Sequence, residues 1–174
     1  KHRLARITTK KIKFIGDKDP RLIDFLLSLK QDFPLNKIIV MKRNPGDIIL
    51  SRTKAKWSKK WPFLFHLILV KGQINFSRKS IRKIDAGSII EVSYENLIKS
   101  PEITVKEIVN FLDLDFENGM LDYINSSKRL TSSDELDWKK NIFKKIDASN
   151  IGKWIIEFSE SKRFLIYKTF KEYY

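Results

Sequence analysis

The segment from Lys37 to Arg52, KIIVMKRNPGDIILSR, constrains the fold more than any other part of the sequence. Its residues 38–41 form an apolar run between lysines, which is typical of a strand buried on both faces of a parallel sheet. Asn44 then suits a helix N-cap, and Pro45 suits the first helical position because proline lacks an N–H that would have no partner there. A buried strand that leads directly into a capped helix predicts an α/β fold in which helices flank a parallel sheet.

The end of the predicted strand carries groups suited to an anionic ligand. Arg43 follows the strand, beside free N–H groups and the positive end of the helix dipole, and Ser51 lies about two helical turns further on. Asp47 complements the same dipole. This combination suits a phosphate, which arginine binds through charge-assisted hydrogen bonds. The alternative is an ordinary strand–helix turn whose arginine meets solvent or a carboxylate.

Composition narrows the class of partner. The 174 residues carry 35 Lys and Arg against 21 Asp and Glu, a formal net charge of +14. This excess of positive charge favours an anionic partner: nucleic acid, acidic lipid, or a phosphorylated or sulfated small molecule. The chain contains no cysteine, which excludes disulfides and thiolate metal sites. His2 and His66 are far apart in sequence, so we expect no metal site.

Length and hydropathy predict one domain over residues 1–174. A hydrophobic content of 42% suffices for one core, and no run reaches the roughly 20 apolar residues of a membrane helix. No secretory signal is visible, so we expect a cytoplasmic protein. Because the sequence begins with Lys1 rather than Met, we also expect this domain to be incomplete at its N-terminus.

The remaining elements follow from patterning and turn residues. In the first half we expect a basic lead-in at 1–11, a strand at 12–15, a helix begun by Asp19 and Pro20, and helices over 45 to about 57 and over 63–81. In the second half we expect a strand at 88–94, a helix after Pro101 and an irregular loop over 125–150. His66 lies within an apolar helical run and is expected to be a packed histidine rather than a catalytic base.

Lysines and tryptophans alternate between residues 54 and 61, KAKWSKKW. Cations interleaved with aromatic rings are typical of a nucleic-acid surface. The alternative, which we favour, is a solvated helix end whose Trp57 and Trp61 pack inward as anchors. We therefore expect no nucleic-acid partner.

The spacing of Arg43, Pro45, Asp47 and Ser51 after a strand resembles a known motif. Arg-x-Pro-x-Asp-x-x-x-Ser is similar to the 3′-phosphate-binding segment of sulfotransferases that use 3′-phosphoadenosine 5′-phosphosulfate. Residues 17–21, DKDPR, look like the turn that precedes this segment in the tyrosylprotein and heparan-type members of the family. There the lysine reaches the sulfuryl group and its bridging oxygen, so the resemblance assigns a catalytic role to Lys18.

Two later segments extend the resemblance. Residues 94–97, YENL, are similar to the family's Tyr-Glu-Asp-Leu, in which the tyrosine borders the adenine, so Tyr94 is a candidate nucleotide contact. Residues 151–154, IGKW, resemble the Ile-Gly-x-Trp that opens a C-terminal helix, and we expect Trp154 to lie in the core. In the family a loop between these segments contacts the cofactor phosphates, and three residues suit that role here: Ser133, Lys139 and Lys140.

The resemblance implies the C-terminal portion of a P-loop-like sulfotransferase fold. It implies 3′-phosphoadenosine 5′-phosphosulfate as cofactor, 3′,5′-adenosine bisphosphate as product, and no metal. The acceptor is a hydroxyl or amine on a carbohydrate, a tyrosine side chain, a lipid or a small alcohol. The family's N-terminal phosphosulfate loop and general base have no counterpart before Lys18. We therefore favour the C-terminal part of a longer sulfotransferase, and two interpretations compete with it: a basic nucleic-acid-binding module and a noncatalytic domain that keeps the fold.

Overall fold

The computed structural model describes residues 15–122 and 147–174. The first half contains the 3₁₀ helix η2 (Pro20–Phe25), α1 (Leu26–Asp32), β1 (Ile38–Lys42), α2 (Pro45–Lys54) and α3 (Phe63–Ile81). There follow η3 (Ala86–Ser88), β2 (Ile89–Ser93), α4 (Tyr94–Lys99), α5 (Pro101–Phe111) and η4 (Asn118–Leu121). The last part contains η7 (Ala148–Asn150), α7 (Lys153–Glu157), α8 (Glu160–Thr169) and η8 (Lys171–Tyr173).

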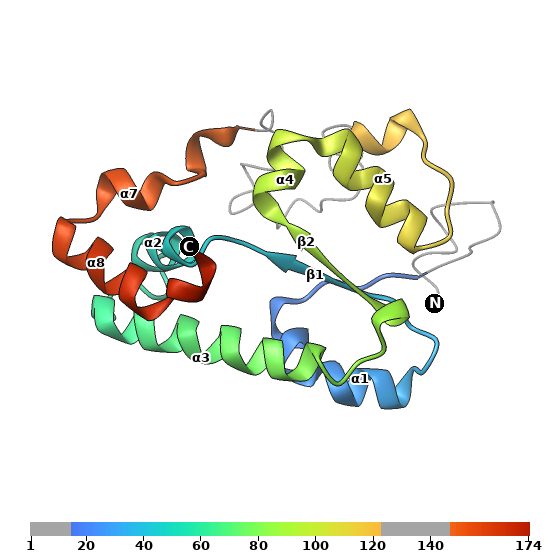
Figure 1. Ribbon diagram of the computed structural model, residues 1–174, viewed down its shortest axis with the longest axis horizontal. Coiled ribbons are helices and arrows are strands. Elements are labelled where there is room, and N and C mark those ends of the chain that lie inside the picture. The colour runs from blue at the N-terminus through green and yellow to red at the C-terminus, as the bar shows by residue number, and fades with distance from the viewer. Residues whose placement is uncertain (1–14, 123–146) are drawn as a thin grey trace.

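The sheet of the described residues has two parallel strands. The register pairs Ile38 of β1 with Ile89 of β2 and ends with Lys42 opposite Ser93. Helices α2 and α3 connect the strands, and Figure 1 shows α1 and α3 on one side of them and α4 and α5 on the other. The predicted α/β class, with a parallel sheet flanked by helices, is confirmed.

Strand β1 is fully covered on one face and only partly covered on the other. Val40 is buried, whereas Ile39 and Met41 on the opposite face are 41% and 47% exposed. The helices on that side, α4 and α5, pack mainly against β2. The expectation of a strand buried on both faces is therefore wrong, because an apolar run does not reveal how far each helix extends across a sheet.

The main core lies beside the sheet, where α7 and α8 close over α2 and α3. Its buried members come from these helices and the segments that follow them: Ile49, Leu50, Leu67, Val70, Trp154, Phe158, Ile166 and Phe170. Trp154 is 1% exposed, so its predicted place in the core is confirmed. The N-terminus of α2 is thus held between the sheet and the C-terminal helices.

Local predictions agree with the structure to different degrees. The helix expected from Phe63 to about Ile81 is confirmed, but the preceding helix ends at Lys54 rather than near 57. Ile15, the described residue of the strand expected at 12–15, lies outside any strand. Residues 1–11 and most of the loop expected at 125–150 lie outside the described residues, and the end of that loop forms η7. Within the described ranges, no helix is long and apolar enough to cross a membrane.

Candidate functional site

The turn between β1 and α2 has the predicted capping geometry. Asn44 precedes the helix, and its Oδ1 accepts a hydrogen bond from the backbone N–H of Gly46 at 2.9 Å. Pro45 occupies the first helical position, as expected for a residue without an N–H. The cap fixes the direction in which β1 enters α2, and thereby places Arg43 at the carboxyl edge of the sheet.

Arg43 meets Tyr94 at this edge. The guanidinium lies over the Tyr94 ring, 4.6 Å from its centre, in a cation–π contact. Nη2 of Arg43 donates to the backbone carbonyl of Asn150 at 3.2 Å. Nε is buried and has no hydrogen-bond partner among the residues that the structure describes. The two cofactor-site candidates that follow neighbouring parallel strands are therefore in direct contact.

A carboxylate joins the two strand ends beneath this pair. Oε1 of Glu95 accepts from the backbone N–H of Asn44 at 2.8 Å, and Oε2 accepts from the Ser93 hydroxyl at 2.9 Å. Both oxygens thus already have partners within the fold. Glu95 thus links the β1–α2 turn to the start of α4 by hydrogen bonds. This link stabilises the relative positions of Arg43 and Tyr94.

Asp47 has a tertiary role that was not predicted from the sequence. Its side chain is buried, with Oδ2 accepting from Gly152 N–H at 2.7 Å and Oδ1 accepting from Trp154 N–H at 3.2 Å. These bonds cap the start of α7, which has no side-chain cap of its own. Both partners belong to the Ile-Gly-x-Trp segment. The sequence signal for this contact was that both family motifs, Arg-x-Pro-x-Asp-x-x-x-Ser and Ile-Gly-x-Trp, occur in one chain. No local pattern shows that the two motifs meet.

Among the described residues, neither Lys18 nor Ser51 forms a hydrogen bond, ion pair or ring contact with Arg43 or Tyr94. The Lys18 backbone N–H donates to Asp17, and its side chain is exposed. The next residue, Asp19, is the predicted N-cap and pairs with Arg21, which lowers the pKa of its carboxyl to about 2. Ser51 is exposed on α2. Three further candidates, Ser133, Lys139 and Lys140, lie outside the described residues.

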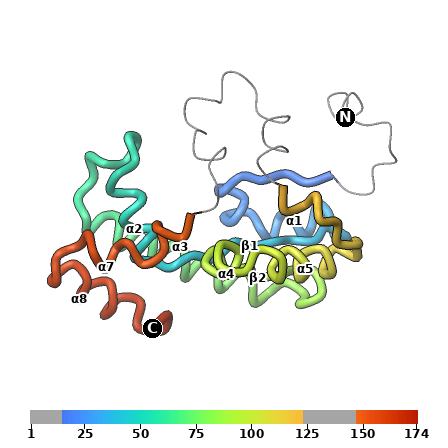
Figure 2. Tube along the Cα trace, turned by 90° about the horizontal axis from the view of Figure 1, so that it is seen from above, coloured from blue at the N-terminus to red at the C-terminus, as the bar shows by residue number. Residues whose placement is uncertain are grey.

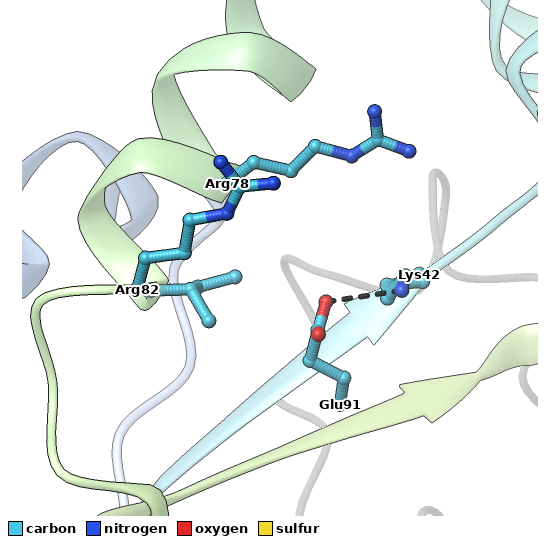
Figure 3. Close-up of a pocket in the computed structure, with 5 residues that line it drawn as sticks. Lys42, Arg78, Arg82 and Glu91 are labelled. Atoms are coloured by element: carbon cyan, nitrogen blue, oxygen red, sulfur yellow. Dashed lines mark ion pairs between the residues drawn. The ribbon is translucent and has the colours of Figure 1, made fainter. Parts of the chain in front are cut away.

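A basic surface lies on the side of the sheet that faces α3. A hollow of about 370 Å³ is lined by Lys42, Arg78, Ile81, Arg82 and Glu91. Figure 3 shows Lys42 paired with Glu91, at 3.1 Å, opposite the two arginines at the end of α3. The 78/82 spacing, one helical turn, was a sequence signal for this cluster. The ranges 15–122 and 147–174 contain no group of three or more His, Cys, Asp or Glu suited to a metal.

The sequence pattern that defines the sulfotransferase family matches residues 2–118. The chain belongs to the sulfotransferase family. This match covers the turn around Lys18, the whole β1–α2 segment and the start of α4. The family resemblance inferred from these motifs is therefore confirmed.

Two sulfotransferase domains of known structure share the fold. One, from the curacin biosynthetic pathway, superposes with a TM-score of 0.63 at 17% identity and covers 89% of this chain and 61% of that domain. The other, from the olefin synthase of Synechococcus PCC 7002, superposes with a TM-score of 0.60 at 21% identity. It covers 89% of this chain and 57% of that domain. The P-loop-like sulfotransferase fold is confirmed.

A relative found by sequence is an uncharacterised protein of Aquifex aeolicus (strain VF5). It is 25% identical over an alignment of 158 positions, which covers 87% of this chain and 20% of that protein. This sulfotransferase-family chain thus spans about a fifth of the length of that relative, and less than two thirds of each of the two solved domains.

Proposed function

We propose that this chain holds the nucleotide end of 3′-phosphoadenosine 5′-phosphosulfate in a sulfotransferase that modifies a hydroxyl or amine. The observation that carries the proposal is the Arg43–Tyr94 pair at the carboxyl edge of two parallel strands. Ligands of open α/β sheets bind at this edge. Family membership supports sulfuryl transfer as the type of reaction.

The donor set at Arg43 fits a phosphate. A guanidinium has five N–H donors, of which one binds Asn150. Nε is buried with no acceptor in the described parts of the chain, and such a donor is costly to leave unpaired. A phosphate oxygen would satisfy it. The Tyr94 ring holds the guanidinium plane in position, which favours bidentate contact over a freely moving charge.

The remaining site residues take their roles from the family. Ser51 would add a hydroxyl to the 3′-phosphate from helix α2, and the outer face of Tyr94 would border the adenine. Lys18 would stabilise negative charge on the bridging oxygen as the sulfuryl group leaves. Three residues outside the described ranges, Ser133, Lys139 and Lys140, would contact the phosphates from the long loop.

When bound, the cofactor supplies the activated sulfuryl group, and the protein contributes orientation and charge. The fixed Arg43 would hold the nucleotide so that the sulfuryl group lies in line with the acceptor. The acceptor itself would be a carbohydrate, a tyrosine side chain, a lipid or a small alcohol. No described residue acts as its general base in this proposal.

Calorimetric titration with 3′,5′-adenosine bisphosphate and its 2′,5′ isomer tests the site. We expect preference for the 3′,5′ isomer. Arg43→Ala should cost a few kcal/mol of binding free energy, because a charge-assisted bond is lost, and Ser51→Ala about 1 kcal/mol. Arg43→Lys should recover only part of the loss, since lysine presents a point charge rather than a planar fork.

Arg82→Ala is the matched control. It removes an exposed arginine from the hollow on the other sheet face and should leave nucleotide affinity unchanged. A loss of affinity in Arg82→Ala with wild-type affinity in Arg43→Ala would move the site to that hollow. The chain could instead bind polynucleotide tightly and in a salt-sensitive way, with no loss in Arg43→Ala. That result would support the hypothesis of a nucleic-acid-binding module.

A further inference from the structure

Five apolar side chains around the start of α3 form an exposed surface. They are Trp57, Trp61, Leu64, Phe65 and Ile68, here called the Trp–Ile surface. Trp57 and Ile68 are each 71% exposed, and Leu64 is 55% exposed. The expectation that Trp57 and Trp61 pack inward is therefore wrong. Figure 2 shows why: the connection between α2 and α3 projects away from the rest of the fold, so its aromatic residues have no core to enter.

The surface is organised by the helix rather than scattered. Residues 64, 65 and 68 follow the spacing of three and four that places side chains on one stripe of α3, and Trp61 lies just before the helix. Trp61 stacks on Phe65, with ring centres 4.6 Å apart. On its other side, α3 buries Leu67 and Val70 in the core. The start of α3 is thus apolar on two sides, but only one of these sides is buried in the core.

The charge around the stripe is of one sign. Residues 48–84 contain ten Lys and Arg and no Asp or Glu. Lys56, Lys59 and Lys60 are exposed beside the two tryptophans, and they form no ion pair with any other described residue. Lys54 differs, because it pairs with Glu157 of α7. An apolar stripe framed by these lysines is complementary to a partner that offers both hydrocarbon and negative charge.

The ring contacts favour lipid over nucleic acid. Single-stranded nucleic acid binds by stacking its bases on open aromatic faces. Here Arg52 lies over the Trp57 ring at 5.0 Å, and Phe65 covers Trp61. Leu64 and Ile68 offer bases no face to stack on, whereas aliphatic side chains enter the boundary between headgroups and acyl chains. Tryptophan and lysine both suit that boundary, because each has an apolar body and a polar end.

We propose that the Trp–Ile surface, with Lys56, Lys59 and Lys60, docks this protein onto a membrane of anionic phospholipid. The tryptophans and the α3 stripe would lie at the headgroup level, and the lysines would bind the lipid phosphates and carboxylates. This is peripheral attachment and does not require a membrane-spanning helix. It is independent of whether the nucleotide site at Arg43 is correct.

Co-sedimentation with lipid vesicles tests the proposal on the full chain. We expect binding to vesicles of phosphatidylcholine with phosphatidylserine, a blue shift of tryptophan fluorescence, and loss of binding as salt is raised. The double variant Trp57→Ala/Trp61→Ala should reduce partitioning at least tenfold. Lys59→Glu/Lys60→Glu should do the same for the anionic vesicles only.

The matched control is Ile156→Ala/Phe164→Ala, which removes two other exposed apolar side chains, 86% and 64% exposed, on α7 and α8. It should partition like the wild type. All altered residues are exposed, and unfolding curves verify that each variant folds. Absence of vesicle binding, or equal loss in the control, overturns the proposal. So does tighter binding to a single-stranded homopolymer than to the vesicles, or dimerisation that Trp57→Ala/Trp61→Ala abolishes without any lipid dependence.

Discussion

The indole of Trp154 lies directly against the backbone of Gly46. A β-carbon built on Gly46 would come within 2.2 Å of Trp154 Cδ2, a distance that no real side chain tolerates. The next residue, Asp47, accepts a hydrogen bond from the Trp154 backbone N–H at 3.2 Å. The first turn of α2, which follows the proposed phosphate site, is therefore packed against α7 by both shape and hydrogen bonding.

Gly46→Ala should destabilise the fold. The added methyl group would displace the Trp154 ring, which is almost fully buried, so we expect the free energy of unfolding to fall by about 1–3 kcal/mol. Denaturant unfolding measures the change. Gly72→Ala is the control, because no atom lies within 4 Å of the position that its methyl group would occupy on α3. It should raise stability by roughly 0.5–1 kcal/mol. A stabilising Gly46→Ala would show that α7 does not pack on α2.

Asp47→Ala should loosen the C-terminal segment. Its carboxylate accepts two backbone N–H groups, and hydrogen bonds to a charged group contribute about 1.5–3 kcal/mol each. We expect a clear loss of unfolding free energy and faster hydrogen exchange at Gly152 and Trp154. Asp47→Asn, which keeps one acceptor oxygen, should lie between Asp47→Ala and the wild type. Unchanged exchange at both amides in Asp47→Ala would contradict the assigned contacts.

Tyr94 should position Arg43 through its ring rather than its hydroxyl. Tyr94→Phe keeps the cation–π face and should bind 3′,5′-adenosine bisphosphate nearly as tightly as the wild type. Tyr94→Leu removes the face and should lose about 0.5–1 kcal/mol of binding free energy. Titration calorimetry measures both. If Tyr94→Phe loses as much affinity as Tyr94→Leu, the hydroxyl rather than the ring is the contact.

His66→Leu should stabilise the protein. The side chain is fully buried, as predicted for a packed histidine, but neither ring nitrogen has a hydrogen-bond partner among residues 15–122 and 147–174. Burial of unpaired polar atoms is costly, so an apolar residue of similar size should raise the free energy of unfolding by about 1 kcal/mol or more. Thermal and denaturant unfolding provide the measurement. A destabilised His66→Leu would mean that the imidazole does have a partner.

Tyr174 should make stability fall in alkaline solution. Partial burial raises the pKa of its hydroxyl to about 12, against an ordinary value of 10.0, although Tyr174 is 52% exposed, and the hydroxyl donates to Asn44 Oδ1 at 3.0 Å. Between these values the unfolded chain releases the proton and the folded chain retains it. The folded state then binds more protons, so the free energy of unfolding decreases as pH rises from about 10 to about 12. The difference in stability between wild type and Tyr174→Phe should shrink across this window. A constant difference would refute the assignment.

Much of the local structure around the candidate site could be predicted because its elements are determined locally. The cap joins Asn44 and Gly46, two positions apart, and the helix from Phe63 to about Ile81 begins with a long apolar run in the sequence. The order of the four motifs identifies the family without any knowledge of tertiary contacts. The helix boundary at residue 54 could not be predicted, because the polar residues after it allow either a helix or a turn.

The sequence by itself determined the strand, the cap, the helices and the types of residue available for an anion. Only the tertiary structure decided which of those residues meet. Asp47 binds Gly152 across 105 positions, and Arg43 reaches Asn150 across 107, distances over which no local pattern carries information. The outward position of Trp57 was likewise decided by where the α2–α3 connection lies relative to the core, because an aromatic side chain is buried only if other elements come to cover it.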